Sequence, residues 1–531
     1  MKYSYFKIAV AGLLAFSLMQ ACTKKLDLVP ANDITPEKVY STPLGYKQAL
    51  AKVYGAMALT GNSGGTGSPD VPSQIISDEG NSDFLRMFWY LQCLTTDEAG
   101  WTYHGNTDPV GIHQMTWSSV NQTVAGLYYR SFFLITLAND FIRQSSDDNL
   151  SKRGISGADA DNIRKYKAEA RFLRAYQYWV LMDLFANPPF VTENDFIGTN
   201  IPKQIQRKDL FAYIESELKA IETELAPART NEYGRADQAA AWALLSRVYL
   251  NAEVYTGTPR YTDAVTYSSK VIGAGYTLHP RYKELMLADN HLNTDEFILT
   301  INYDGTKTQN WGGTTTLTHG PAGVTPDSSG TSGNWGCIRM TQQFVDLFGT
   351  ADIRGQFWTS GQNKNMTQLL DVTTDGYSST KFRNKTRTGA IAPNRDPAGN
   401  WVDIDFPLFR LAEVYLTYAE AVARGGGGST ATALSYLQQL SVRARPTDPA
   451  ASSFAQLTLP YIIAERGREL FWECSRRTDL IRFGQFTTNA YLWAWKGGVP
   501  NGTAVDPKYN IFPIPSTDLS ANPNLVQNPG Y

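Results

Sequence analysis

The chain has 531 residues, of which 42% are hydrophobic and 18% charged, with 48 basic against 50 acidic side chains and a net charge of −2. This apolar content excludes a disordered chain, and the balanced charge argues against a nucleic-acid-binding protein, which would show a basic excess or stripe. Aromatic residues make up 12% of the chain, more than a core of this size obviously needs, so we expect some rings at the surface. With 4 Cys and 5 His, the composition predicts no disulfide scaffold and indicates no metal site or cofactor, although a structural Ca²⁺ stays open.

Residues 1–21 are predicted to form a lipoprotein signal peptide. Lys2 and Lys7 lie beside an apolar run over 8–19 that is too short to span a bilayer as a helix. Cys22 follows Ala21 and precedes polar residues, an order that resembles a bacterial lipobox, so we expect Cys22 to carry the lipid that anchors the mature chain. The alternative is an ordinary secretory peptide with an incidental cysteine. No later segment offers a clean apolar run long enough for a membrane span, so lipid is the membrane anchor that the sequence predicts.

Helical periodicity dominates the mature chain. A first helix is predicted within 30–58, with Thr35-Pro36-Glu37 as its start signal, and another over 120–143. Three later helices are each followed by a loop and a second helix; the pairs are 165–186 with 208–225, 236–255 with 262–272, and 408–424 with 429–445. Because no such pair can bury its apolar face alone, the recurrence predicts tetratricopeptide-like helix pairs that stack into a superhelical scaffold.

About 130 residues, 273–406, interrupt this scaffold and are rich in Gly, Thr, Asn and Asp. Only short β-like runs, such as 297–301, appear in them, so we predict a loop-rich insertion with a few short β-hairpins. The mature chain, 22–531, is therefore predicted to be a single, mostly α domain. Its scaffold covers about 30–272 and 407–484, and 485–531 form a C-terminal tail. Long irregular segments in a compact protein are usually where function lies.

Sequence blocks in a fixed order carry a family resemblance. They are Thr95-Thr96-Asp97-Glu98-Ala99, the segment 168–176 with Asn187-Pro188-Pro189 after it, the segment 408–416 with Ala419-Glu420-Ala421, Arg466-Gly467-Arg468-Glu469-Leu470 through 479–484, and the closing Phe512-Pro513-Ile514-Pro515 with 527–531. Together with the leader, these blocks resemble the SusD/RagB family of outer-membrane nutrient-binding lipoproteins over nearly the whole chain. Asn187-Pro188 departs from the Gly-Asp turn that the family usually shows there, a difference that affects only the turn.

The resemblance implies a lipid-anchored protein on the outer face of the outer membrane. Such proteins bind oligosaccharide or polysaccharide, sit as a lid on a SusC-like TonB-dependent transporter and deliver the glycan to it. The helix pairs are expected to face the transporter, with the binding loops on the other side. The resemblance implies no enzymatic activity and no nucleic-acid partner.

Binding of a glycan sets its own chemical requirements. A pyranose presents C–H patches that stack on an aromatic face, and its hydroxyls pair with polar side chains, whose loss costs about 1 to 3 kcal/mol. Rings in polar, Gly-rich loops are therefore the predicted ligand-binding residues; they are Trp101, Tyr103, Tyr303, Trp311 and Trp335. The resemblance singles out Trp101 and Trp311, because family members place glycan-contacting rings in the matching loops. Three other tryptophans lie in periodic helices and are predicted core residues: Trp179, Trp242 and Trp472.

Other functions stay open at this point. A surface-anchored glycoside hydrolase needs two carboxylates about 5 to 9.5 Å apart, whereas adjacent Asp97 and Glu98 point in different directions. A formal G-x-S-x-G match at 61–65 follows a helix and runs toward prolines, so Ser63 lacks the context of a nucleophile elbow and no catalytic residue is predicted. A peptide-binding or assembly subunit of the transporter is the other alternative. Of Cys93, Cys337 and Cys474, at most one pair can form a disulfide, and buried free thiols are equally compatible.

Overall fold

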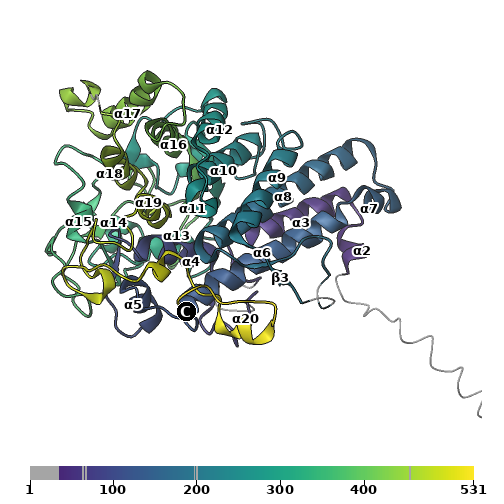
Figure 1. The fold of residues 1–531 in the computed structure, drawn as a ribbon, viewed down its shortest axis with the longest axis horizontal. Helices are drawn as coiled ribbons and strands as arrows, with labels where there is room; N and C mark the ends of the chain where they lie inside the picture. Colours follow the sequence, from purple (N-terminus) through teal and green to yellow (C-terminus); the bar gives the residue numbers. More distant parts are fainter. Residues whose placement is uncertain (1–34, 63–64, 66–68, 197, 199–200, 454–455) are drawn as a thin grey trace, which may run out of the picture.

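The structure, a computed structural model, describes residues 35–62, 65, 69–196, 198, 201–453 and 456–531 (Figure 1). The predicted signal peptide, Cys22 and Ser63 lie outside these residues. Within them the protein is mostly helical, and its short strands form two-stranded antiparallel pairs. This confirms the predicted mostly α fold.

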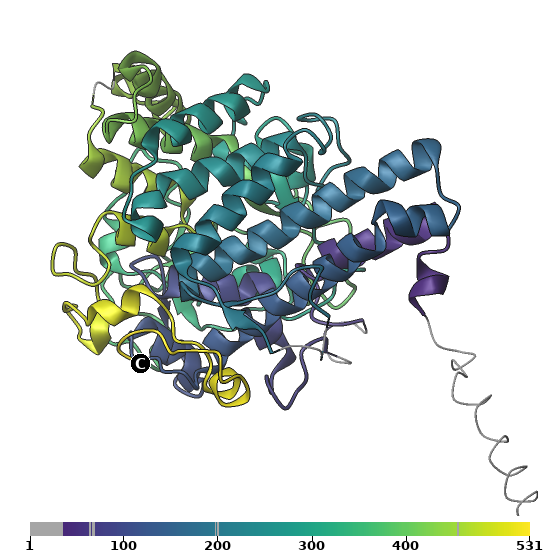
Figure 2. The ribbon, with the colours of Figure 1, turned by 45° about the vertical axis from the view of Figure 1, so that its right-hand side comes forward.

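The N-terminal part is built on three long helices that run side by side (Figure 2). They are α3 (Pro43–Gly55), α6 (Gln122–Gln144) and α8 (Gly157–Phe185). Thr35 caps the short helix α2 (Pro36–Val39), as its sequence signal predicts. A second proline follows at Pro43, with Thr42 as its N-cap, and the residue before a proline is disfavoured in a helix. The single helix predicted within 30–58 is therefore two helices.

The three predicted helix pairs are confirmed (Figure 1). Helix α8 packs on α9 (Arg207–Ile221), α10 (Gln238–Leu250) on α12 (Tyr261–Gly273), and α16 (Leu411–Ala423) on α17 (Thr430–Ala444). Helix α12 also packs on α16, so the second and third pairs stack directly although the insertion separates them in sequence. The fully buried Ala264 and Ala433 lie on the second helices of these pairs.

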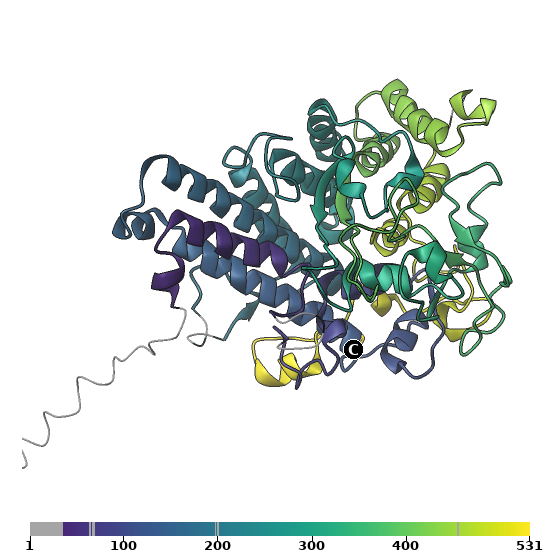
Figure 3. The ribbon, with the colours of Figure 1, turned by 180° about the vertical axis from the view of Figure 1, so that it is seen from behind.

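The insertion forms the loop-rich side of the molecule (Figure 3). Its elements are η4 (Tyr282–Glu284), η5 (Asn290–Leu292), β4 (Phe297–Ile301), α13 (Gly313–His319), α14 (Pro326–Ser329), β5 (Ile338–Arg339), α15 (Gln342–Val345), β6 (Phe357–Trp358) and β7 (Ser378–Ser379). The strand pairs are β1 (Gly100–Trp101) with β5, β2 (Pro189–Phe190) with β3 (Lys203–Gln204), β4 with β8 (Phe406–Arg410), and β6 with β7. Two of these pairs, β1–β5 and β4–β8, join segments that are far apart in the chain.

The remaining elements are shorter than the scaffold helices. They are η2 (Glu79–Ser82), α4 (Phe84–Trp89), η3 (Tyr90–Leu94), α5 (Thr107–His113), α7 (Asp147–Lys152), α11 (Ala252–Thr256), η6 (Pro449–Ser453), α18 (Leu459–Leu470), α19 (Arg476–Arg482), η7 (Lys496–Gly498), η8 (Pro507–Asn510) and α20 (Ser516–Ala521). One apolar cluster extends from Tyr40 to Leu525 and includes residues of the helices, the insertion and the C-terminal tail.

A buried ion-pair network fastens the insertion to the helices that follow it. Glu469 of α18 contacts Arg410 at 2.6 Å and Arg354 of the insertion at 2.9 Å. Arg410 also contacts Glu296, which directly precedes β4, at 2.8 Å, and Arg443 of α17 contacts both carboxylates at 2.5 Å. These side chains are almost fully buried, so removing one member would leave an uncompensated buried charge.

Candidate functional site

Four of the five predicted rings meet around one open hollow. The hollow has a volume of about 490 Å³, and we call it the ring-lined hollow; its lining residues are Asp78, Arg86, Trp101, Tyr103, Asn106, Trp311, Trp335 and Cys337. They come from the loop before η2, from α4, from β1 and the loop after it, and from two loops of the insertion. The fold therefore collects rings that the sequence places far apart.

The pairing of β1 with β5 brings Trp101 and Tyr103 close to Trp335. Trp101 lies opposite Ile338 in this pair. Just beyond it, the Thr102 amide donates to the Cys337 carbonyl at 2.9 Å, and its hydroxyl donates to the Gly336 carbonyl at 3.0 Å. These bonds fix the loop that carries Tyr103 beside the loop that carries Trp335.

The block 95–99, which directly precedes β1, has a structural role. Asp97 accepts two hydrogen bonds from Arg476 of α19, at 2.7 and 2.8 Å. Glu98 is buried; its carboxylate accepts from the Trp472 amide at 3.2 Å, and its carbonyl accepts from the Trp472 indole at 3.1 Å. Burial raises the pKa of Glu98 to about 8, although the Arg476 guanidinium opposes the shift. The block 95–99 thus holds β1, and with it Trp101 of the ring-lined hollow, against α19 and the segment that carries Trp472.

The four rings differ in exposure. Tyr103 is 53% exposed, Trp335 is 38% exposed and Trp311 is half-buried, so these three offer surface to a ligand. Trp101 is only 2% exposed; it packs edge-on against Tyr90 and its indole donates to the Tyr103 carbonyl at 3.0 Å. The expectation of an exposed ring is therefore wrong for Trp101, because β1 turns this ring toward the core. Trp101 therefore contributes only a small exposed surface to the lining of the hollow.

Tyr303 lies outside the ring-lined hollow and in the core, so its expected exposure is also wrong. It follows the buried strand β4 after one residue, its amide donates to Asp405 at 2.8 Å, and burial raises the pKa of its hydroxyl. The ring lies against Gly313, where a Cβ atom would be 2.5 Å from the Tyr303 ring and where φ is +55°. Tyr303 thus packs beneath the turn that starts α13, two residues after Trp311.

Further rings support Trp311 and Trp335. Trp401 packs edge-on against Trp311 with ring centroids 4.2 Å apart, and His319 stacks on Trp335 at 5.3 Å. Trp311 and Trp335 themselves lie 6.1 Å apart with an angle of 58° between their planes. The two rings therefore form an angled wall.

The sequence reasoning missed Arg86, Asp78 and Asn106 as lining residues. Arg86 is nearly buried, donates to the Tyr90 hydroxyl at 3.0 Å and to the Trp311 carbonyl at 3.3 Å, and lies 5.9 Å from the Trp335 ring centroid. Burial disfavours its charge, but Tyr90 and Asp78 outweigh this effect and raise its pKa. A single arginine inside the apolar run 84–89 was the available signal, because an isolated charge in such a run needs a partner.

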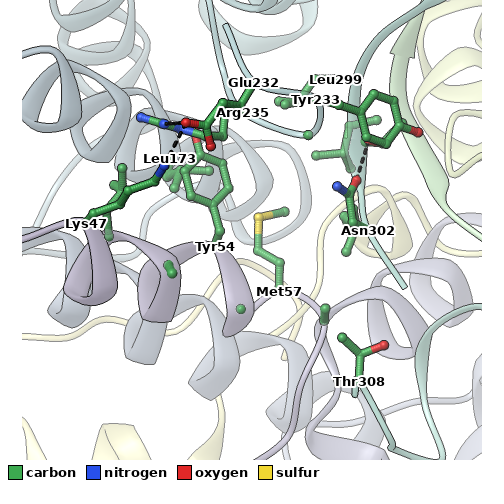
Figure 4. Close-up of a pocket in the computed structure, with 18 residues that line it drawn as sticks. Lys47, Tyr54, Met57, Leu173, Glu232, Tyr233, Arg235, Leu299, Asn302 and Thr308 are labelled. Carbon is green, nitrogen blue, oxygen red and sulfur yellow. Dashed lines mark hydrogen bonds and ion pairs between the residues drawn. The ribbon is translucent and has the colours of Figure 1, made fainter. Parts of the chain in front are cut away.

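A second cavity, of about 280 Å³, lies between α3 and β4 (Figure 4). Lys47 and Tyr54 of α3, with Met57 just beyond the helix end, form one wall, and a loop with Glu232 forms part of the other. Lys47 and Glu232 form an ion pair at 2.7 Å. None of the five predicted rings lines this cavity, so we do not assign the glycan site to it.

The described residues also bear on metals, thiols and membrane spans. Among them, no group of three or more His, Cys, Asp or Glu side chains is placed to hold a metal ion. The three thiols within them, Cys93, Cys337 and Cys474, are free and buried. No helix in the described ranges is long and apolar enough to cross a membrane.

Known proteins resemble the chain along its full length. The sequence profile of the SusD family matches residues 350–531, and a profile described as starch-binding associating with outer membrane matches residues 75–250. The starch-binding protein SusD of Bacteroides thetaiotaomicron is 36% identical, and the alignment covers 100% of both chains. A SusD-like protein of Bacteroides ovatus is 26% identical over 71% of this chain and 68% of its own.

Solved structures share the fold. Surface glycan-binding protein A from Bacteroides thetaiotaomicron matches with a TM-score of 0.71 at 20% identity, over 93% of this chain and 100% of that one. The same protein in complex with laminarihexaose matches with a TM-score of 0.69 at 20% identity, over 91% of this chain and 98% of that one. At these identities the likeness shows the fold alone. The 36% identity to SusD along the whole chain, together with the two profile matches, shows that the chain belongs to the SusD family.

Proposed function

We propose that the protein is a cell-surface lipoprotein that binds a glycan in the ring-lined hollow. The observation that carries this proposal is the meeting of four aromatic rings with Arg86, Asp78 and Asn106 around one open hollow. Rings stack on sugar faces, while the guanidinium, carboxylate and amide pair with hydroxyls. The names of the relatives, a starch-binding protein and a surface glycan-binding protein in complex with laminarihexaose, support the same ligand class.

The angle between Trp311 and Trp335 favours a bent glycan. Their planes differ by 58°, so a flat, straight chain cannot lay successive sugar faces on both rings. A chain that turns between neighbouring sugars, as an α-1,4-glucan does, can contact both. We therefore expect maltooligosaccharides to bind more tightly than cellooligosaccharides of equal length.

Binding without hydrolysis fits the polar groups of the hollow. Of the described residues that line it, Asp78 alone carries a carboxylate, whereas glycoside hydrolysis generally uses two. We therefore assign the protein a binding function with no catalytic residue. Hydrolysis and peptide capture are the outcomes that would overturn this assignment.

The remaining parts of the proposal concern location and partner. Lipidation of Cys22 would hold the protein on the outer membrane, and a SusC-like TonB-dependent transporter would receive the glycan. A profile match described as associating with outer membrane supports this location. Co-purification of the tagged protein with a SusC-like transporter from solubilised outer membranes tests the partner, and its failure would remove delivery while leaving glycan binding intact.

Calorimetry with a panel of neutral oligosaccharides tests glycan binding. We expect Trp311→Ala and Tyr103→Ala to weaken binding by at least fivefold, because each removes a ring that faces the hollow. Phe196→Ala is the matched control, since this ring is 58% exposed but lines another cavity. Unchanged affinity in both hollow variants, or release of shortened sugars by the purified protein, would contradict the proposal.

A further inference from the structure

A further hollow, on the loop-rich insertion, is lined by three cationic side chains and one carboxylate, that of Asp327. It has a volume of about 400 Å³ and shares no lining residue with the ring-lined hollow; we call it the basic hollow. Its lining includes Arg383, Lys385 and Arg387, the Trp358 ring, and the hydroxyl-bearing residues Thr325, Ser328 and Thr386. Three cations at alternate positions of one segment thus converge on one cavity.

Backbone hydrogen bonds hold the segment that carries Arg383 and Lys385. The Arg383 amide donates to the Met286 carbonyl at 3.2 Å, and the Asn384 amide donates to the Ser329 carbonyl at 2.7 Å. Side chains of successive residues in an extended segment point to opposite sides. Accordingly, Asn384 is fully buried, whereas Arg383 and Lys385 both line the basic hollow. The two cations are therefore held side by side before any ligand arrives.

Two of the three cations already have protein partners. Lys385 donates to the Asp327 carbonyl at 2.7 Å and contacts the Asp327 carboxylate at 3.2 Å, but this carboxylate is 96% exposed and therefore compensates the charge little. Arg387 contacts Asp289 at 3.0 Å and Glu284 at 3.4 Å, so its charge is compensated inside the protein. The third cation differs from both.

The Arg383 guanidinium has no hydrogen bond or ion pair with any residue in the described part of the chain. Its Nε is buried without a partner, and burial lowers its pKa with no opposing charge. A buried, unpaired cationic donor costs free energy. An oxyanion in the basic hollow would satisfy this donor and compensate the charge.

We propose that the basic hollow binds the oxyanion of an acidic sugar, a sulfate, phosphate or carboxylate group, with Arg383 as its main contact and Lys385 as the second. Guanidinium groups match the planar, two-point geometry of carboxylates and phosphates. The Trp358 ring beside them offers a face for the sugar that carries the charge. The carbohydrate part of this inference rests on the proposed function, whereas the oxyanion part rests on the basic hollow alone.

NMR titration of the tryptophan indole signals of the mature protein tests the inference, with the Trp358 signal assigned through Trp358→Phe. The probes are methyl glucuronide, glucose 6-sulfate, glucose 6-phosphate, neutral glucose and sodium sulfate. We expect the acidic sugars to shift the Trp358 signal, to bind more tightly than sodium sulfate and to lose affinity as NaCl is raised. Neutral glucose should leave this signal in place.

Single substitutions separate the contributions of Arg383 and Lys385 to binding. Arg383→Gln should weaken the acidic sugars at least tenfold, and Lys385→Gln should weaken them less. Lys364→Gln is the matched control, because it removes an exposed cation of the same insertion that pairs with Asp346 elsewhere. Since the Arg383 side chain has no partner among the residues that the structure describes, Arg383→Gln should melt no lower than the native protein, which keeps the binding result interpretable.

Three results would contradict the inference. An equal response to glucose, or full affinity in Arg383→Gln, would overturn the oxyanion site. Binding of sodium sulfate as tight as that of the acidic sugars would overturn the carbohydrate part. Trp311→Ala should leave acidic-sugar binding at Trp358 unchanged, so unchanged neutral-glycan affinity in this variant would count against the ring-lined hollow and not against the basic one.

Discussion

At the residue scale, Trp335 and Trp101 line the same hollow but serve different purposes. Trp335→Ala removes a ring that is 38% exposed, so we expect glycan affinity to fall by about 1 to 2 kcal/mol, or five- to thirtyfold, with a stability loss of at most about 1 kcal/mol. Trp101→Ala removes a buried ring and should cost about 3 to 5 kcal/mol of unfolding free energy. Calorimetry and urea unfolding measure the two effects.

Tyr303→Phe is the control for both variants. The Tyr303 hydroxyl is buried and has no hydrogen-bond partner in the described ranges, so its removal should leave glycan affinity unchanged and should leave stability unchanged or slightly raised. A loss of affinity in this variant would place Tyr303 in contact with the glycan after all.

Glu98 gives the protein a predicted pH dependence. The folded state keeps a proton on this carboxyl up to about pH 8, whereas the unfolded chain releases it near the ordinary value of 4.5. The folded state therefore binds more protons between these pH values, and the contribution of Glu98 to stability falls as the pH rises, by at most about 1.4 kcal/mol per unit.

Glu98→Gln removes this titration while keeping the shape of the side chain. The unfolding free energy of the native protein, minus that of the variant, should decrease from pH 5 to pH 8 and level off above. Because both proteins share every other titrating group, the difference isolates Glu98. A difference that stays flat would mean that Glu98 is ionised in the folded protein at neutral pH.

The exposure expected for single rings agrees with the structure for three of them and not for two, whereas their contact with a ligand stays a prediction. Tyr103, Trp311 and Trp335 lie in polar loops and offer surface to the hollow, as predicted. Tyr303 has equally polar neighbours, yet it lies two residues beyond the end of the buried strand β4, and local composition does not reveal what covers such a turn. Trp101 is buried because β1 pairs with a strand that lies far along the chain.

At the element scale, amphipathic helices and the five-residue strand β4, expected at 297–301, were predictable, whereas strands of two residues were not. Apolar residues recur at helical spacing over many residues in the paired helices, so these pairs can be predicted even when their boundaries are off by a few residues. The pairs are α8–α9, α10–α12 and α16–α17. A strand of two residues, such as β1 or β5, carries no period, and its partner is set by the completed fold. The ring-lined hollow depends on such a pair, so its assembly was not readable from the sequence.

The ion pair between Asp97 and Arg476 predicts how firmly β1 is held. Asp97→Ala leaves a buried guanidinium without its carboxylate, so we expect a loss of about 3 to 5 kcal/mol in urea unfolding. The double variant Asp97→Ala/Arg476→Met should lose less than the sum of the two single changes. Asp161→Ala is the matched control, since it breaks an exposed pair with Arg164 of the same length, 2.7 Å, and should cost under about 1 kcal/mol. Equal losses for the buried and the exposed pair would contradict the anchoring role of the block 95–99.

At the scale of the whole molecule, the predicted lipid anchor can be tested separately from the folded part. Cys22→Ala should abolish incorporation of labelled fatty acid and shift the protein from the membrane fraction to the soluble fraction of the cell envelope. Glycan affinity should not change, because every residue of the ring-lined hollow lies at or beyond Asp78. Retention of the label in this variant would show that another residue carries the lipid.

The buried network around Glu469 has a consequence for limited proteolysis. The exposed turn 388–390 lies between Arg354 and Arg410, two arginines that contact the same glutamate. A single cut in that turn would leave Arg354 on the N-terminal fragment and Arg410 on the C-terminal fragment. Both arginines would stay ion-paired with Glu469. The nicked protein should therefore elute from a sizing column as one particle, and its halves should separate only in denaturant.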